Sequence, residues 1–204
     1  APIKGNIKQS ASKWCYRGLS TEQLCAEGKK FGLQGLDLLR PGGDFDTLKK
    51  HGIVCTMTSC NGIGKGFNRT ENHEGLIGNL IPTIDATAAA GFPNVIVFSG
   101  NCQGMGKEEG LKNCTEGLKK VVGHAEKKKV CLCMEYLNSK QHKDYMCDDS
   151  KWAFELVKAV GSPNFKILYD IYHVAMMEAT IEEVDGKKVA KHNIDELITK
   201  NIDC

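Results

Sequence analysis

The sequence predicts an α/β fold in which helices cover a parallel sheet, and three observations support this. Short apolar, β-branched runs alternate with longer helical patterns along the chain, as in parallel α/β proteins. The predicted strands begin near residues 7, 33, 53, 94, 130 and 165, so a unit averages about 30 residues, the unit of a (β/α)8 barrel of ~250 residues. No linker divides the 204 residues. We therefore expect one domain over residues 1–204.

Each unit carries its own local signals. The predicted strands cover residues 6–16, 33–39, 53–60, 94–101, 130–138 and 165–173. The predicted helices cover residues 20–32, 44–52, 72–90, 108–128 and 150–160. Ser20 and Gln23 have the spacing of a capping box at the start of the first helix. Lys127, Lys128 and Lys129 are cations suited to the end of the fourth.

The regular pattern weakens after His173. Residues 178–204 are polar and rich in lysine, and we interpret them as a divergent tail of one or two amphipathic helices with a turn at Asp185-Gly186. No convincing strand is visible there. With about six units, the chain is either an incomplete barrel or an open doubly wound sheet.

Composition excludes several classes of protein. With 41% hydrophobic and 25% charged residues, the chain has the balance of a soluble globular protein. The net charge of +2 comes from 27 basic and 25 acidic residues without a basic stripe, which argues against a nucleic-acid partner. No apolar run approaches the ~20 residues of a membrane-spanning helix.

The ten cysteines do not predict a disulfide scaffold. Several of them lie in apolar strands, as Cys55, Cys131 and Cys133 do, so we expect buried, reduced thiols. The Cys131-x-Cys133 pair lacks zinc-finger spacing. This favours a cytoplasmic protein, although a chain that starts at Ala1 is also compatible with export after removal of a signal peptide.

Two carboxylates end consecutive predicted strands. Glu135 shares a strand face with Cys133, and Asp170 shares one with Leu168. Active sites of parallel α/β folds form at these ends of strands, and two carboxylates there can converge on a divalent cation. The alternative is that Glu135 and Asp170 cap loops or pair with lysines. Likewise, His173 is equally explained by a hydrogen bond to a backbone carbonyl, and Asn138 by an Asx-turn.

Glycine-rich loops follow the third and fourth predicted strands, at residues 61–69 and 99–110. The glycines do not match the dinucleotide-binding fingerprint, because no helix opens directly at them. We expect a mobile lid over the site, with Lys65 and Arg69 available to bind an anionic substrate. The alternative for either cation is a solvated, flexible loop.

Several segments together resemble the hydroxypyruvate isomerase family, within the xylose isomerase-like sugar isomerases and epimerases of TIM-barrel fold. The resemblance lies in "CMEYLNSKQHKDYMCDD", "VGSPNFKILYDIYHVAMME", "GLQGLDLL", "NHEG" and "AAAGFPNVIVFSGN", and covers roughly residues 6–178. It implies a xylose isomerase-like TIM barrel, a divalent metal ion such as Mg²⁺ or Mn²⁺, and a small sugar or hydroxy-acid substrate such as hydroxypyruvate.

The resemblance also implies roles for individual residues. Glu135 matches the family's glutamate that binds the metal and transfers a proton, Asp170 matches a metal ligand, and His173 matches a residue that contacts the substrate. With the metal polarising the carbonyl, removal of the neighbouring carbon-bound proton gives an enediolate, and its return to the other carbon interconverts ketone and aldehyde. Glu135 and His173 are therefore the expected catalytic residues, and Asn138, Lys65, Arg69 and His173 the expected substrate-binding ones.

The chain departs from the family after Met177. Family members supply a third metal ligand from the seventh strand and a second catalytic glutamate from the eighth, and neither has a recognisable match here. The candidates to replace them are Glu178, Glu182, Glu183 and His192. An incomplete barrel also leaves two open sheet edges, which is compatible with a homo-oligomer.

Three hypotheses follow. The first is a metal-dependent isomerase acting on hydroxypyruvate or a related small sugar. The second is a catalytically inactive, truncated barrel that binds a small polyol, an acid or a partner chain through the same face. The third is a DNA-repair endonuclease of the same barrel type, but this needs more metal-binding histidines and a basic face.

Overall fold

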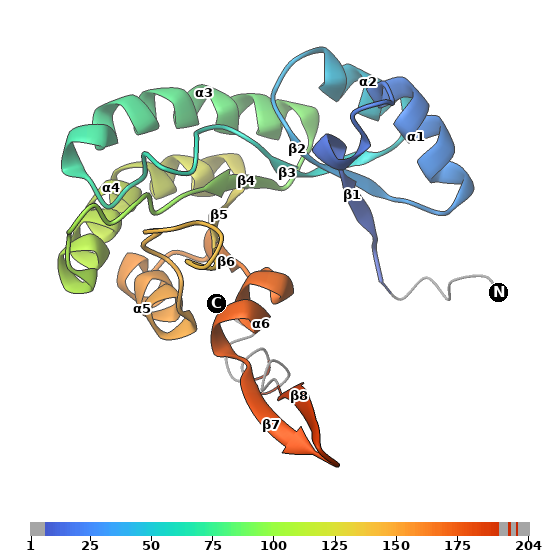
Figure 1. The fold of residues 1–204 in the computed structure, drawn as a ribbon. Helices are drawn as coiled ribbons and strands as arrows, with labels where there is room; N and C mark the ends of the chain where they lie inside the picture. The colour runs from blue at the N-terminus through green and yellow to red at the C-terminus, as the bar shows by residue number, and fades with distance from the viewer. Residues whose placement is uncertain (1–6, 192–195, 197–198, 200–204) are drawn as a thin grey trace.

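A single parallel sheet of six strands forms the centre of the molecule (Figure 1), in a computed structural model that describes residues 7–191, Glu196 and Thr199. The strands are β1 (Ser10–Ser12), β2 (Gly35–Leu39), β3 (Val54–Thr58), β4 (Asn94–Val97), β5 (Cys131–Glu135) and β6 (Phe165–Leu168). Their order in the sheet is their order in the chain, and every neighbouring pair is parallel. A doubly wound sheet would reverse its strand order at a switch point. The fold is therefore a partial barrel, with β1 and β6 at the two edges of this sheet.

Helices follow the strands as expected. They are α1 (Thr21–Lys30), α2 (Gly43–His51), α3 (His73–Ala90), α4 (Lys107–Lys128) and α5 (Ser150–Val160), with short 3₁₀ turns η1 (Lys13–Tyr16) and η2 (Thr70–Asn72). The Ser20 side chain accepts a hydrogen bond from the Gln23 backbone and Gln23 reciprocates, which confirms the capping box. Lys129 ends α4 in the left-handed region, directly after Lys127 and Lys128 in the last turn. The observed bounds of these helices lie within two residues of the bounds predicted from the sequence.

Two apolar clusters hold the helices against the sheet. The larger lies under α3, α4 and α5, which pack side by side on the outside of β4, β5 and β6 (Figure 1). The smaller lies under α1 and α2 and includes Phe45 and Phe92, whose rings meet edge to face at 4.8 Å. No helix of the described residues is long and apolar enough to cross a membrane. The nine described cysteines are free thiols, and five of them are buried as expected; Cys15 is exposed, and Cys60, Cys102 and Cys131 are half-buried. Cys204 lies outside the described residues.

The glycine-rich loop after β3 is docked on the loop after β4, so the expectation of a mobile lid is wrong for residues 64–69. Phe67 and Asn68 donate backbone hydrogen bonds to Phe98 and Ser99, at 3.2 and 2.9 Å. Gly66 is buried, and a Cβ atom there would lie 2.2 Å from the backbone nitrogen of Gly100. The glycines therefore serve close contact between two backbones.

The sixth strand ends earlier than expected, and residues 180–191 of the tail are a hairpin rather than a helix. Strand β6 stops at Leu168, and α6 (Ile171–Glu178) follows within three residues. Residues 180–191 then form an antiparallel hairpin of β7 (Thr180–Val184) and β8 (Lys187–Lys191), which projects away from the sheet (Figure 1). Asp185 and Gly186 have φ angles of 51° and 72°, which suit the tight turn of a two-residue hairpin.

Beyond the hairpin, only two residues of the tail are described. Glu196 and Thr199 are helical, and His192 lies outside the described residues. The expectation of helix is therefore wrong for residues 180–191, where the Asp-Gly pair is a hairpin signal that outweighs the weak strand propensity of lysine and glutamate.

Candidate functional site

Glu135 is the last residue of β5 and pairs in register with Leu168 of β6. Its side chain is buried, and among the described residues no hydrogen bond or ion pair reaches its carboxylate. Burial raises the pKa of the Glu135 carboxyl from 4.5 to about 8, and the nearby charge of Asp170 adds to the increase. A largely buried carboxylate beside a second carboxylate is stabilised by a cation or a proton.

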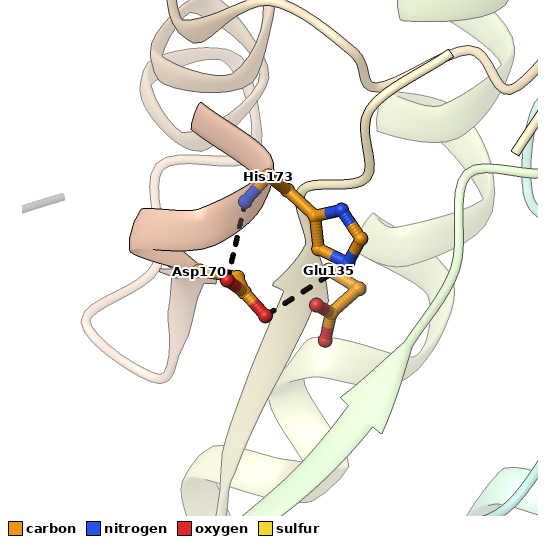
Figure 2. A group of neighbouring side chains, drawn as sticks. All are labelled: Glu135, Asp170 and His173. Atoms are coloured by element: carbon orange, nitrogen blue, oxygen red, sulfur yellow. Dashed lines mark hydrogen bonds and ion pairs between the residues drawn. The ribbon is translucent and has the colours of Figure 1, made fainter. Parts of the chain in front are cut away.

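Asp170 faces Glu135 from the next βα connection (Figure 2). It is the N-cap of α6: its Oδ1 accepts hydrogen bonds from the backbone N–H groups of Tyr172 and His173, at 2.8 and 3.3 Å. Its Oδ2 lies 3.8 Å from Nε2 of His173. Oδ1 therefore caps the start of α6, and Oδ2 faces the site.

The ring of His173 is fixed by Asn138, from the loop after β5. The backbone N–H of Asn138 points at Nδ1 of His173 at 3.3 Å, and its side-chain Nδ2 lies 2.5 Å from the same atom. The Asn138 amide cannot be turned round, because its Oδ1 accepts the backbone N–H of Gln141 at 2.8 Å. Since a backbone N–H can only donate, Nδ1 must be an acceptor, and the neutral ring carries its proton on Nε2.

This tautomer gives His173 an N–H donor on the side that faces the site. Burial lowers the pKa of the His173 imidazole, Asp170 acts in the opposite direction, and the neighbouring His142 lowers it further. The His142 ring meets the His173 ring edge to face at 5.3 Å. The imidazole is thus suited to hydrogen-bond a substrate oxygen rather than to coordinate a metal through Nε2.

The geometry fits a divalent cation. Ligand atoms of Glu135, Asp170 and His173 lie within 4.8 Å of one another (Figure 2), and they are the one such group among the described residues. One carboxylate oxygen from the end of β5 and one from the connection after β6 suit a hard cation such as Mg²⁺ or Mn²⁺. The unpartnered, buried carboxylate of Glu135 is the observation that favours a cation here.

The described candidates for replacing the missing ligands, Glu178, Glu182 and Glu183, lie outside the cluster. Glu178 accepts hydrogen bonds from the Tyr136 hydroxyl and the Ser150 backbone, at 3.1 and 2.9 Å, so it is held at the start of α5. Glu182 pairs with Lys191 across the hairpin, where Glu183 is also exposed. Within the described part of the chain, the cluster at Glu135 and Asp170 therefore has no third carboxylate ligand.

The expected anion-binding cations do not reach the site. Lys65 is exposed on the loop after β3. Arg69 donates from its guanidinium to the backbone carbonyls of Cys102 and Gln103, at 2.7 and 3.2 Å. It therefore joins the two glycine-rich loops, and neither cation is among the residues that line the cavity described next.

A cavity of about 810 Å³ occupies the inner face of the sheet, and each of the six strands contributes to its wall. Glu135, Asp170 and His173 line it, whereas Asn138 lies behind the His173 ring. Further lining residues, which no sequence motif indicated, are Trp14, Asp37, Asn61, Asn94 and His142. Asp37 and Asn94 lie on predicted strands, but nothing in the strand pattern distinguishes them from their neighbours.

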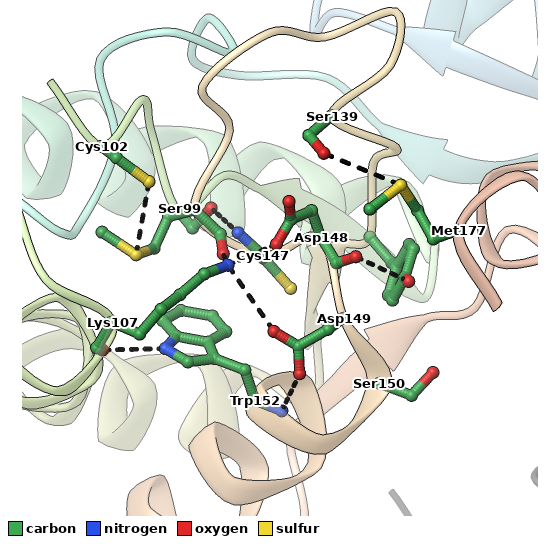
Figure 3. A network of polar contacts seen from close by, with 12 residues as sticks. Ser99, Cys102, Lys107, Ser139, Cys147, Asp148, Asp149, Ser150, Trp152 and Met177 are labelled. Carbon is green, nitrogen blue, oxygen red and sulfur yellow. Dashed lines mark hydrogen bonds and ion pairs between the residues drawn. The ribbon is translucent and has the colours of Figure 1, made fainter. Parts of the chain in front are cut away.

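The loop that carries Asn138 and His142 is clamped by Lys107 at the start of α4 (Figure 3). The Lys107 ammonium donates to the Met146 carbonyl and contacts the Asp148 carboxylate, and its backbone carbonyl accepts the Trp152 indole N–H at 2.9 Å. A rigid loop of this kind preserves the hydrogen bonds that orient His173.

Buried Tyr145 ties the same loop to the strand ends. Its hydroxyl donates to the Glu135 carbonyl at 3.1 Å and accepts the Ser99 backbone N–H at 3.0 Å. The Ser99 hydroxyl in turn accepts the backbone N–H of Cys147 at 3.0 Å (Figure 3). The loop after β5 therefore holds the backbone of Glu135, and this loop is itself bound to the loop after β4 through Ser99.

Solved structures of several different kinds of protein share this fold. The chain is 16% identical to an AP endonuclease of family 2 from Brucella melitensis, with a TM-score of 0.76 over 95% of this chain and 75% of that one. It is 13% identical to D-psicose 3-epimerase with D-tagatose from Clostridium cellulolyticum H10, with a TM-score of 0.68 over 82% of this chain and 64% of that one. It is 17% identical to the IOLI protein with a bound zinc atom, with a TM-score of 0.67 over 84% of this chain and 65% of that one.

At these identities the likeness shows the fold alone. The chain spans three quarters of the first structure and just under two thirds of the other two. The search of curated proteins found no match. A family model described as Xylose isomerase-like TIM barrel matches residues 46–197. Because this match spans most of the 204 residues and the sheet has the corresponding strand order, the chain belongs to the xylose isomerase-like TIM barrel family.

Proposed function

We propose that this protein is a metal-dependent isomerase or epimerase that removes a carbon-bound proton from a small hydroxy-carbonyl compound, either hydroxypyruvate or a related small sugar, and returns it to the adjacent carbon or to the same one. The observation that carries the proposal is the buried Glu135 carboxylate, which has no partner among the described residues and lies beside Asp170 and the N–H donor of His173. A D-psicose 3-epimerase and a 3-keto-D-glucoside 4-epimerase from E. coli are among the proteins of similar fold, which supports this class of reaction.

Each residue has a separate task in this proposal. Glu135 and Asp170 hold a divalent cation, which would polarise the substrate's carbonyl and hydroxyl oxygens. Glu135 takes the proton from the carbon next to the carbonyl and returns it to the adjacent carbon on the same face of the enediolate. An epimerisation needs in addition a proton donor on the opposite face. His173 donates its Nε2–H to a substrate oxygen and so stabilises the negative charge that develops there.

Exchange of the substrate's carbon-bound proton with solvent tests the proposal directly. The full chain is incubated in D₂O with Mn²⁺ and either hydroxypyruvate or D-fructose, and the loss of the C–H signal is followed by NMR. We expect exchange that chelation abolishes and that Glu135→Gln reduces by about 10²-fold or more, the usual contribution of a general base. Glu116→Gln, an exposed change on α4, is the matched control.

The possible outcomes separate the hypotheses. Exchange that survives Glu135→Gln would contradict the role of Glu135. Absence of exchange in the parent, with Mn²⁺ bound, would instead favour the second hypothesis, a barrel that binds a small polyol or acid without converting it. That hypothesis gains weight from the lack of a second carboxylate base in the metal group of the described residues.

A further inference from the structure

A third carboxylate, Asp37 on β2, lines the same cavity as Glu135 and Asp170. It is not part of the metal-binding group. Among the described residues its one hydrogen bond comes from the Ser10 hydroxyl, which donates to Oδ2 at 2.7 Å, and its Oδ1 is buried without a partner. A carboxylate can accept about four hydrogen bonds, so most of this capacity is unused. Burial raises the pKa of the Asp37 carboxyl, as expected for a group short of donors.

The backbone around Asp37 is built irregularly. The register between β2 and β3 shifts on both sides of Asp37, and Leu38 has a φ angle of 61°, which a leucine inside a strand rarely adopts. Successive residues of a strand normally point to opposite faces, yet Asp37 and Leu38 both line the cavity. Bulges of this kind redirect side chains and are frequent next to binding sites.

The wall around Asp37 is polar but carries no positive charge. Ser12, Thr56 and Asn94 line the cavity with it, and the Asn94 amide donates to the Thr56 carbonyl at 2.8 Å. No lysine or arginine is found among the described residues that line the cavity. One divalent cation would balance two of the three carboxylates, which leaves an environment unfavourable to an anion.

We propose that Asp37 binds a hydroxyl group of the substrate remote from the metal, so that the site selects an uncharged polyhydroxy compound longer than three carbons over an anionic three-carbon acid. The inference rests on the proposed function and narrows its substrate class. Asp37 accepts a hydrogen bond from the substrate hydroxyl at Oδ2, beside the Ser10 hydroxyl. The cavity volume of about 810 Å³ lies within the range of pockets that hold ligands larger than three-carbon acids.

Calorimetric titration of the Mn²⁺-loaded full chain with three ligands tests this inference. D-Fructose is long and neutral, dihydroxyacetone is short and neutral, and hydroxypyruvate is short and anionic. We expect D-fructose to bind more tightly than dihydroxyacetone. Asp37→Ala should weaken D-fructose binding by about tenfold or more, the usual loss of a hydrogen bond to a charged group, leave dihydroxyacetone unchanged, and strengthen hydroxypyruvate binding.

Two further variants keep the test decisive. Asp46→Ala, an exposed change on α2, is the matched control and should alter none of the three affinities. Asp37→Asn preserves the size and one acceptor oxygen while it removes the charge, so it serves if Asp37→Ala does not fold. This variant should strengthen hydroxypyruvate binding and weaken D-fructose binding less than Asp37→Ala does.

Two results would overturn the inference: D-fructose binding no tighter than dihydroxyacetone, or D-fructose affinity that does not respond to either Asp37 variant. Because the readout is binding, it does not depend on catalysis. If proton exchange fails in the parent but the binding pattern holds, the isomerase proposal is wrong and the role of Asp37 stands. If exchange occurs but the binding pattern fails, the inference about Asp37 is wrong and the isomerase proposal stands.

Discussion

Replacing Glu135 by glutamine should change how the metal-free protein's stability depends on pH. Burial and the charge of Asp170 raise the pKa of the Glu135 carboxyl from 4.5 to about 8. The folded protein therefore holds a proton here that the unfolded chain releases at lower pH. Its contribution to stability is fully present below the unfolded pKa and is lost as the pH rises through the folded one.

The upper limit of this loss follows from the two pKa values. Each pH unit between 4.5 and about 8 corresponds to about 1.4 kcal/mol, so the parent loses at most about 5 kcal/mol across the range. Glutamine has nearly the same shape and stays neutral. Glu135→Gln should therefore match the parent in stability near pH 5 and exceed it near pH 8, by at least about 1 kcal/mol.

Urea denaturation with a chelator present, at pH 5, 6, 7 and 8, measures the difference. Other titrating groups cancel when the variant is compared with the parent at each pH, and Glu116→Gln should follow the parent throughout. Adding Mn²⁺ at pH 8 should stabilise the parent and leave Glu135→Gln nearly unaffected. Parallel stability curves for the parent and Glu135→Gln would refute the view that Glu135 is buried without a charge partner.

Three other changes test the fold and the site. Gly66→Ala should lower the free energy of unfolding by about 3 kcal/mol or more, because its Cβ atom would meet backbone at 2.2 Å; Gly62→Ala, which meets nothing within 4 Å, is the control in urea denaturation. Asp170→Asn should weaken Mn²⁺ binding in calorimetry while it keeps the N-cap of α6, whereas Asp170→Ala should also cost about 1 kcal/mol of stability. Lys107→Met should speed amide hydrogen exchange across residues 139–149, which its ammonium clamps.

Periodic features of the chain were predictable from sequence, because each unit repeats the same local physics. The helices 73–90, 107–128 and 150–160 begin and end within one residue of their predicted bounds. Glu135 and Asp170 could be paired in advance because parallel strands bring their carboxyl ends to one edge of the sheet. The strand order then decided between a barrel and a doubly wound sheet.

Features that depend on contacts distant in sequence were not predictable in the same way. The tautomer of His173 is set by Asn138, 35 residues earlier in the chain. Asp37 was hidden within a regular strand pattern, because a bulge leaves no signature when its left-handed residue is leucine. The loop around Gly66 has the composition of a flexible lid. Its glycines are needed because its backbone lies against the backbone of the loop after β4, which is distant in sequence.

The proposed metal site has one carboxylate at the end of β5 and one in the connection after β6, and this number of ligands limits its affinity for the cation. Mg²⁺ often binds through one or two carboxylates and completes its coordination with water or substrate oxygens. A site of this kind binds its cation weakly alone and more tightly when a hydroxy-carbonyl compound supplies further oxygens. By thermodynamic reciprocity, the cation must then tighten substrate binding by the same factor. In the sugar-binding experiment, the affinity for D-fructose should therefore rise with Mn²⁺ concentration in the parent and not in Asp170→Asn.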